Sequence, residues 1–197
     1  ANWLLFFLIL TEQVGGGCKQ PATAPLDLSL NAGQILGLTG PNGVGKTTVL
    51  SALAGRAKCF SGKIHLRPGL RMAMQTQEIA PVTGLPLSGK ELLALTQASP
   101  SGLPAWLLER LDQRLDKLSG GQRHYLSLWT ILQAPADVVL LDEPTNNLDT
   151  AGTEHLAIAL RQRVADGAAI ILVSHDDSFV SKVCDQVLVL KGISDVG

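Results

Sequence analysis

A glycine-rich segment carries the clearest chemistry of this sequence. It reads Gly40, Pro41, Asn42, Gly43, Val44, Gly45, Lys46, Thr47 and Thr48. Residues 40–47 match the pattern GxxxxGK[ST] between an apolar run and a helical pattern, which is the context this pattern requires. Glycines let the backbone curl so that its N–H groups point inward at phosphate oxygens, and a helix N-terminus adds partial positive charge. We therefore predict a phosphate site in which Lys46 reaches the β- and γ-phosphates and the Thr47 hydroxyl ligates Mg²⁺.

Two carboxylates close a later apolar run. Asp142 and Glu143 directly follow Val138–Leu141. Taken alone, the pair is equally consistent with a solvated turn before Pro144. Beside a phosphate loop, carboxylates at the C-terminal end of a strand are the expected pair for metal-assisted phosphoryl transfer. We therefore expect Asp142 to hold Mg²⁺ through water and Glu143 to polarise the attacking water.

The elements that must position these residues follow from the hydrophobic pattern. Apolar runs alternate with helical patterns, which predicts an α/β domain. Strands are expected at Ile35–Thr39, Val138–Leu141, Ala169–Val173 and Val187–Leu190, and helices at Lys46–Ala54 and Thr150–Ala165. The apolar run Trp3–Leu10 is too short for a membrane helix, which needs about twenty residues, and it lacks the basic start of a signal peptide. We interpret it as a buried or edge strand.

The middle of the chain has a different composition. Residues 79–104 carry four prolines with scattered Gly and Ser. The leucines that follow, Leu107, Leu108, Leu111 and Leu115, have the spacing of a short amphipathic helix. We expect a helical subdomain at about 79–134, inserted into an α/β core formed by residues 1–78 and 135–197, within one domain.

Composition limits the class of function. Hydrophobic residues make up 46% of the chain and charged residues 17%, which favours a folded domain with a sizeable core over disorder. The net charge of −1 lacks the basic footprint of a general nucleic-acid binder, so no direct nucleic-acid partner is expected. Cysteines occur at positions 18, 59 and 184. This odd number without metal-ligand spacing favours free thiols.

Three further motifs resemble those of ATP-binding cassette (ABC) ATPases. They are Leu118-Ser119-Gly120-Gly121-Gln122, the segment LDEPTNNLD from Leu141 to Asp149, and Ser174-His175-Asp176. Together with the phosphate loop they stand in the order of that family, over roughly residues 8–192. The resemblance implies a P-loop NTPase core with a small helical insert, and a Mg²⁺-dependent ATPase with ATP and Mg²⁺ as cofactors.

The resemblance also implies how the motif at residues 118–122 acts. Residues Ser119, Gly120, Gly121 and Gln122 match the signature that closes on the γ-phosphate of ATP held by an opposite cassette. Ser119 is a good N-cap, and the glycines expose N–H groups at a helix start. In the family fold this motif cannot reach the phosphate loop of its own chain. A head-to-tail dimer, either homodimer or heterodimer, with two sandwiched ATP molecules is therefore implied.

Single residues take further roles from the resemblance. Gln77 matches the glutamine that touches Mg²⁺ and the attacking water, with Gln75 as the competing choice. His175 matches the switch histidine that contacts the γ-phosphate, and Asp149 matches the loop that communicates between the two sites. The family usually stacks adenine on an aromatic residue about thirty positions before the loop lysine, but residues 15–19 contain none. We expect discrimination between ATP and GTP to be poor.

Two branches of the family are compatible with these motifs. One is the energy-coupling subunit of a membrane transporter, since residues 70–93 and 173–180 resemble the cassettes of zinc- and manganese-type metal importers. The alternative is a non-transport ABC-F-type ATPase acting on ribosomes, which LDEPTNNLD and the Ser-His-Asp motif also resemble. Such proteins usually carry two cassettes and a charged linker, and this chain has neither. A degenerate cassette is disfavoured by Glu143 and His175. We favour a transporter subunit that binds an integral membrane subunit, in the cytoplasm at the inner face of the plasma membrane.

Overall fold

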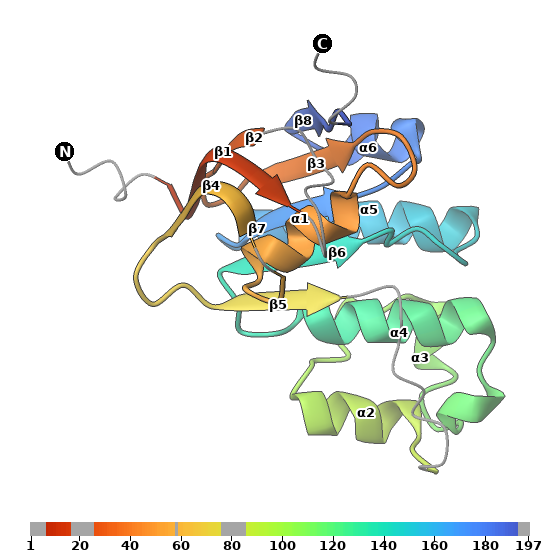
Figure 1. The fold of residues 1–197 in the computed structure, drawn as a ribbon. Coiled ribbons are helices and arrows are strands. Elements are labelled where there is room, and N and C mark those ends of the chain that lie inside the picture. The colour runs from red at the N-terminus through yellow and green to blue at the C-terminus, as the bar shows by residue number, and fades with distance from the viewer. Residues whose placement is uncertain (1–6, 17–25, 58, 76–85, 193–197) are drawn as a thin grey trace.

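The computed structural model describes residues 7–16, 26–57, 59–75 and 86–192, which form two β-sheets and the helices around them (Figure 1). The strands are β1 (Ile9–Gly16), β2 (Leu26–Leu30), β3 (Ile35–Thr39), β4 (Cys59–Leu66), β5 (Met72–Gln75), β6 (Val138–Asp142), β7 (Ala169–Val173) and β8 (Gln186–Val189). The helices are α1 (Lys46–Leu53), α2 (Gly89–Thr96), α3 (Ala105–Leu108), α4 (Gly120–Leu132), α5 (Thr150–Ala165) and α6 (Asp177–Val183), with a 3₁₀ helix, η2 (Leu115–Lys117). A parallel sheet has the strand order β5-β6-β7-β3-β8, and an antiparallel sheet has the order β2-β1-β4. The predicted α/β class is confirmed.

The central strands of the parallel sheet are apolar runs that the sequence predicted. β3, β7 and the helix α5 have the predicted bounds, β6 extends one residue further, and β8 is shifted one residue earlier. Every residue of β6 and β7 is buried, as is typical of parallel strands covered on both faces. Their register sets Asp142 beside Val173. The carboxyl ends of the two strands, where ligands bind in such folds, therefore lie at the same edge of the sheet.

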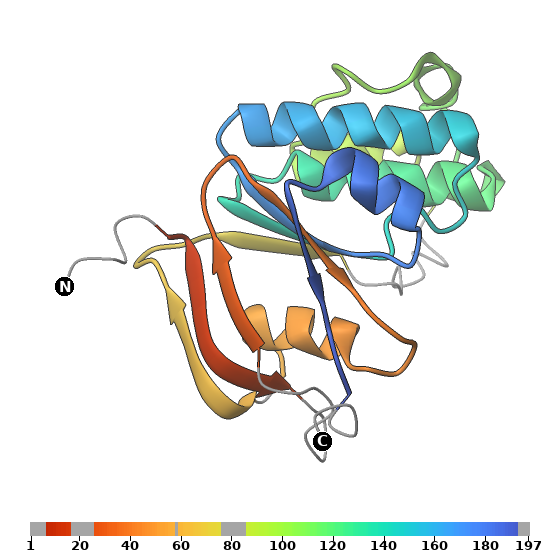
Figure 2. The same ribbon diagram turned by 90° about the horizontal axis from the view of Figure 1, so that it is seen from above.

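Different layers cover the two faces of the parallel sheet. Figure 2 shows α1 and the antiparallel sheet on one face, and α5 and α6 on the other. Side chains of β6 alternate between these layers because successive residues of a strand point to opposite faces. Val138 and Leu140 belong to the cluster that includes α1, whereas Val139 and Leu141 belong to the cluster of α4 and α5. The same alternation directs Asp142 toward the α1 side.

The first strand differs from the sequence-based expectation. β1 begins at Ile9 and continues to Gly16, and it is the middle strand of the antiparallel sheet. The predicted strand at 3–10 ends too early. Of the two predicted alternatives, buried or edge, the buried one is confirmed for Leu8 and Ile9; residues 1–6 lie outside the described part of the chain. Thr11 continues the strand because its buried hydroxyl donates to the Leu26 carbonyl at 3.1 Å and accepts from the Leu28 N–H at 2.9 Å.

The helical subdomain contains α2, α3 and α4, of which α4 lies next to β5 (Figure 1). The single amphipathic helix predicted over 107–115 is wrong, because α3 ends at Leu108 and η2 begins at Leu115. Between them the backbone bonds to the start of α2: the Leu111 carbonyl accepts from the Lys90 N–H and the Gln113 carbonyl from the Gly89 N–H. Leu107, Leu111 and Leu115 are buried in this turn-rich segment, whereas Leu108 is exposed.

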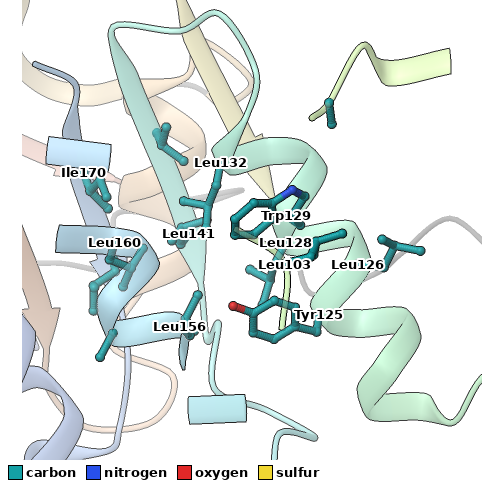
Figure 3. Packing of buried hydrophobic residues seen from close by; sticks show 14 of the residues in the cluster. Leu103, Tyr125, Leu126, Leu128, Trp129, Leu132, Leu141, Leu156, Leu160 and Ile170 are labelled. Atoms are coloured by element: carbon teal, nitrogen blue, oxygen red, sulfur yellow. The ribbon is translucent and has the colours of Figure 1, made fainter. Parts of the chain in front are cut away.

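α4 joins this subdomain to the core through large buried side chains (Figure 3). Trp129 is buried, and its Nε1 donates to the Ser99 carbonyl at 2.7 Å. Tyr125 is completely buried and its hydroxyl bonds to Nδ1 of His155 on α5. Burial raises the pKa of the Tyr125 hydroxyl. Among the described residues, none of the helices combines the length and apolar character needed to span a bilayer.

Candidate active site

A pocket of about 350 Å³ opens at the carboxyl ends of β6 and β7, beside the start of α1. Its lining residues are Asn42, Gly43, Gly45, Lys46, Thr47, Thr48, Asp142, Glu143 and Val173. The structure therefore brings the phosphate loop and the acidic strand end together, although about a hundred residues separate them along the chain. Val173 is the one lining residue that the sequence did not single out as functional. Its position at the end of an apolar strand was the available signal.

The backbone of the phosphate loop adopts conformations that favour glycine. Gly40, Gly43 and Gly45 have φ angles of 139°, 78° and 97°. At Gly40 a Cβ would also lie 2.7 Å from the Leu190 carbonyl oxygen, so the loop passes too close to the segment after β8 for any side chain. These glycines bring the backbone into the curled form that anion binding requires.

α1 starts at this loop without a side-chain cap. Its N-cap is Gly45, and no side chain bonds to the first turn. The first N–H that bonds back along the helix is that of Val49, to the Gly45 carbonyl at 2.9 Å. The preceding N–H groups are those that a helix leaves without internal partners. They point out of the positive end of the helix dipole and are suited to bind an anion.

Lys46 supplies the positive charge of the pocket. Its side chain is largely buried, and Nζ donates to the carbonyl oxygens of Gly40 at 2.8 Å and Pro41 at 3.1 Å. These bonds hold the ammonium group against the inside of the loop. An ammonium in this position can donate to phosphate oxygens that enter the loop.

Asp142 is a buried acid without a hydrogen-bond partner among the described residues. It is 1% exposed, and neither carboxyl oxygen is bonded. Burial raises its pKa, with a further rise from the charge of Glu143, while the nearby Thr47 hydroxyl and the Lys46 ammonium oppose the rise. A buried carboxylate is costly unless it is paired or binds a metal ion. Asp142 and the Thr47 hydroxyl are hard oxygen donors of the kind that Mg²⁺ prefers, so the residues present are compatible with this ion.

Glu143 and His175 form a hydrogen-bonded pair at the side of the pocket. Nδ1 of His175 lies 2.8 Å from Oε2 of Glu143, and the His175 backbone N–H donates to the same oxygen at 3.3 Å. The structure thus places His175 within hydrogen-bond distance of Glu143, the carboxylate that we proposed as the general base from the sequence. Glu143 itself has a φ of 50°, which is uncommon for a residue with a side chain. Its N–H donates to the Val173 carbonyl at 2.9 Å.

The signature residues lie away from this pocket, at the start of α4. Ser119 accepts a hydrogen bond from the Gln122 N–H at 3.2 Å, and the Gln122 side chain accepts one from the Ser119 N–H at 3.0 Å. This is a capping box. Gly120 has open space around it, whereas a Cβ on Gly121 would lie 2.5 Å from the Asn147 carbonyl oxygen. Gly121 is therefore needed for close packing within the chain, a role that the sequence did not reveal.

The remaining predicted residues have different positions. Asp149 is the N-cap of α5, and its Oδ1 accepts from the Gly152 N–H at 2.8 Å. Gln77 lies outside the described residues. Gln75 is buried at the end of β5, in register with Leu141. Its side chain therefore lies on the face of the sheet opposite to Asp142.

Comparison with known proteins identifies the family. A family model described as "ABC transporter" matches residues 23–146. The chain belongs to the ABC transporter family.

A zinc import ATP-binding protein, ZnuC, from Pseudomonas entomophila (strain L48) is 35% identical over 191 residues, which cover 93% of this chain and 74% of that protein. A solved ATP-binding subunit of an ABC transporter has a TM-score of 0.77 and 21% identity, and the match covers 95% of this chain and 91% of that one. A metal-chelate type ABC transporter in an inward-facing conformation has the same TM-score with 22% identity, over 94% of this chain and 79% of that one.

These matches decide between the two branches of the family. This ABC ATPase is an ATP-binding and ATP-hydrolysing cassette, the energy-coupling subunit of a membrane transporter. The prediction of a transporter cassette is confirmed, and the comparisons give no support to the ABC-F alternative.

Proposed function

We propose that this ABC ATPase binds ATP with Mg²⁺ in the pocket beside α1 and hydrolyses it with Glu143 as the general base. The observation that carries the proposal is the meeting of Lys46, Thr47, Asp142 and Glu143 around one pocket. A cation, a hydroxyl and two carboxylates at the start of a helix are the groups that phosphoryl transfer to water requires. No single one of these residues would support this reaction alone.

Each residue has a distinct part in this reaction. The loop N–H groups and Lys46 hold the β- and γ-phosphates, and the Thr48 and Asn42 backbones complete the loop. Thr47, Asp142 and Gln77 would hold Mg²⁺, which when bound neutralises charge on the phosphate oxygens. Glu143 orients a water molecule and takes its proton as the water attacks. His175 bonds to Glu143 and would also contact the γ-phosphate.

A second cassette completes the site in this proposal. Ser119 and Gly120 are exposed at the start of α4, outside the pocket of their own chain. With Gly121 and Gln122, they would close on the γ-phosphate held by an opposite cassette, and Asp149 would lie in the loop between the two sites. The chain would act as a single ABC domain, with a core at 1–78 and 135–197 and a helical subdomain at about 79–134.

We further propose a metal-import role at the membrane. The relative from Pseudomonas entomophila is named a zinc import ATP-binding protein, so a transition-metal cargo and import are the first cargo and direction to test. The cassette would bind an integral membrane subunit through its helical subdomain, and would be cytoplasmic at the inner face of the plasma membrane.

The test measures both ATP hydrolysis and dimer formation. Glu143→Gln should lower the rate of ATP hydrolysis by roughly 10²–10⁴-fold, because general-base help contributes about that much, while ATP affinity stays within a few-fold of wild type. Chelation of Mg²⁺ should abolish turnover of the wild-type protein. Because the mutant holds ATP without consuming it, ATP should convert Glu143→Gln from monomer to dimer in size-exclusion chromatography.

A second substitution tests the exposed signature residues at the start of α4. Ser119→Arg in the Glu143→Gln protein should abolish the dimer, because the arginine fills the space into which the γ-phosphate must move. Ser88→Arg is the matched control, since Ser88 caps α2 of the same subdomain through the same kind of capping box. The control should keep the dimer. Wild-type turnover by Glu143→Gln, or equal loss of the dimer in both arginine variants, would contradict the proposal.

A further inference from the structure

A buried histidine connects the signature helix to the acidic strand end. His124 lies on the first turns of α4 and is 6% exposed. Its Nε2 lies 3.1 Å from the carbonyl oxygen of Pro144, the residue that directly follows Glu143. Three residues earlier on α4, and so on the same side of the helix, Gly121 packs against the Asn147 carbonyl. Two points on one face of α4 thus contact the loop from Pro144 to Asn147.

The direction of this hydrogen bond is determined by its acceptor. A carbonyl oxygen can only accept, so Nε2 of His124 must carry the hydrogen and donate it. Burial lowers the pKa of His124, although the Pro144 carbonyl opposes this shift. The lowered pKa keeps the ring neutral near pH 7. The neutral ring then carries its proton on Nε2.

The unfavourable backbone conformation of Glu143 needs neighbouring contacts that stabilise it. A residue with a side chain at a φ of 50° costs free energy and persists only when neighbouring contacts determine it. The Glu143 N–H is fixed by the Val173 carbonyl at 2.9 Å, and its carbonyl accepts from the Asn146 N–H at 3.1 Å. The peptide that follows is fixed by His124. Among the described residues, His124 is the side chain that donates to the backbone of this loop.

We propose that His124 is a positioning residue for Glu143. By holding the Pro144 carbonyl, it fixes the turn that directs the Glu143 carboxylate. It also couples the position of α4 to the position of that carboxylate. The inference rests on the proposed role of Glu143 as the base. His124 itself touches neither nucleotide nor water in this proposal.

The experiment compares three variants of His124 with a control on the same helix. His124→Leu keeps a similar volume but cannot donate, and it should lower kcat roughly 10–100-fold, the scale of a small misplacement of a reacting group, with KM for ATP within about twofold. His124→Gln offers an amide N–H of similar reach and should restore kcat to within a few-fold of wild type. His124→Asn offers the same donor on a shorter side chain, and it should behave like His124→Leu.

Tyr125→Phe is the matched control. It removes a buried hydrogen bond of α4, the one to His155, that does not involve Pro144, so it should lower Tm without changing kcat. If His124→Leu is folded and has wild-type kcat, the inference is wrong. It is also wrong if His124→Gln is as slow as His124→Leu, or if Tyr125→Phe loses as much kcat. Should His124→Leu fail to fold, His124→Asn provides the same comparison with His124→Gln. Wild-type turnover by Glu143→Gln would instead refute the role of the base, which these variants do not test.

Discussion

The two helix starts that carry nucleotide motifs, those of α1 and α4, use their backbone N–H groups differently. At α1 the N-cap is Gly45, which has no side chain, and the first turn receives no cap from the chain. At α4 the N-cap is Ser119, which forms a reciprocal capping box with Gln122. The start of α1 lines the pocket with Asp142, whereas the start of α4 lies outside it.

Under the proposed function, this difference indicates which part of the site one chain supplies by itself. The start of α1 and the groups around it line a single pocket, so we expect a lone chain to bind phosphate there. The start of α4 is already stabilised by its own side chains and needs no ligand to fold. Its exposed Ser119 and Gly120 can act on a nucleotide only if another molecule brings one.

Among changes at the two helix starts, the largest expected effect comes from removing the charge at the start of α1. Lys46→Ala should weaken ATP binding roughly 10–150-fold, because a hydrogen bond to a charged group contributes about 1.5–3 kcal/mol. Titration of purified monomer with labelled ATP measures this effect. The corresponding change at the α4 start, Ser119→Ala, should leave the affinity of the monomer unchanged. An equal loss in both variants would show that the two helix starts do not differ in the way described.

A smaller effect is expected on the free energy of unfolding, and it differs between two adjacent glycines at the start of α4. Gly121→Ala should lower the free energy of unfolding by about 1–3 kcal/mol, the usual cost of overpacking, because its Cβ would lie 2.5 Å from the Asn147 carbonyl oxygen. Gly120→Ala meets open space and should be neutral or stabilising by up to about 1 kcal/mol, since alanine favours helix over glycine. Urea unfolding of both variants provides the comparison. A destabilised Gly120→Ala with an unaffected Gly121→Ala would contradict the packing at this helix start.

The smallest effect is on the pH dependence of stability. Because burial lowers the pKa of His124 in the folded protein, the unfolded chain takes up a proton first as the pH falls below about 6.5. The free energy of unfolding should therefore fall between pH 7 and 5.5, by no more than about 1.4 kcal/mol per pH unit from this group. The raised pKa of Asp142 acts in the opposite direction as the pH falls. His124→Gln should show a shallower fall than wild type in urea titrations over this range; identical slopes would refute the assignment.

The predictions that succeeded rest on continuous stretches of sequence. β3 and β7 have the predicted bounds because their apolar runs match burial in a sheet covered on both faces. α5 has the predicted bounds because its apolar residues recur along one buried helix face. The predictions that failed depended on partners elsewhere in the chain. Thr11 continues β1 because the backbone of β2 satisfies its hydroxyl, and the leucines after α3 avoid a helix because their backbone bonds to the start of α2.

The sequence alone predicted the chemistry of the phosphate loop and of the acidic strand end, since each is a contiguous motif. It also predicted an α/β domain in which the carboxylates lie beside the phosphate loop. Only the tertiary structure decided that His175 lies on Glu143, that Gly121 packs on Asn147 and that His124 bonds to Pro144. These contacts join residues from different elements, and their distances depend on how α4, β6 and β7 pack, which no local pattern in the sequence encodes.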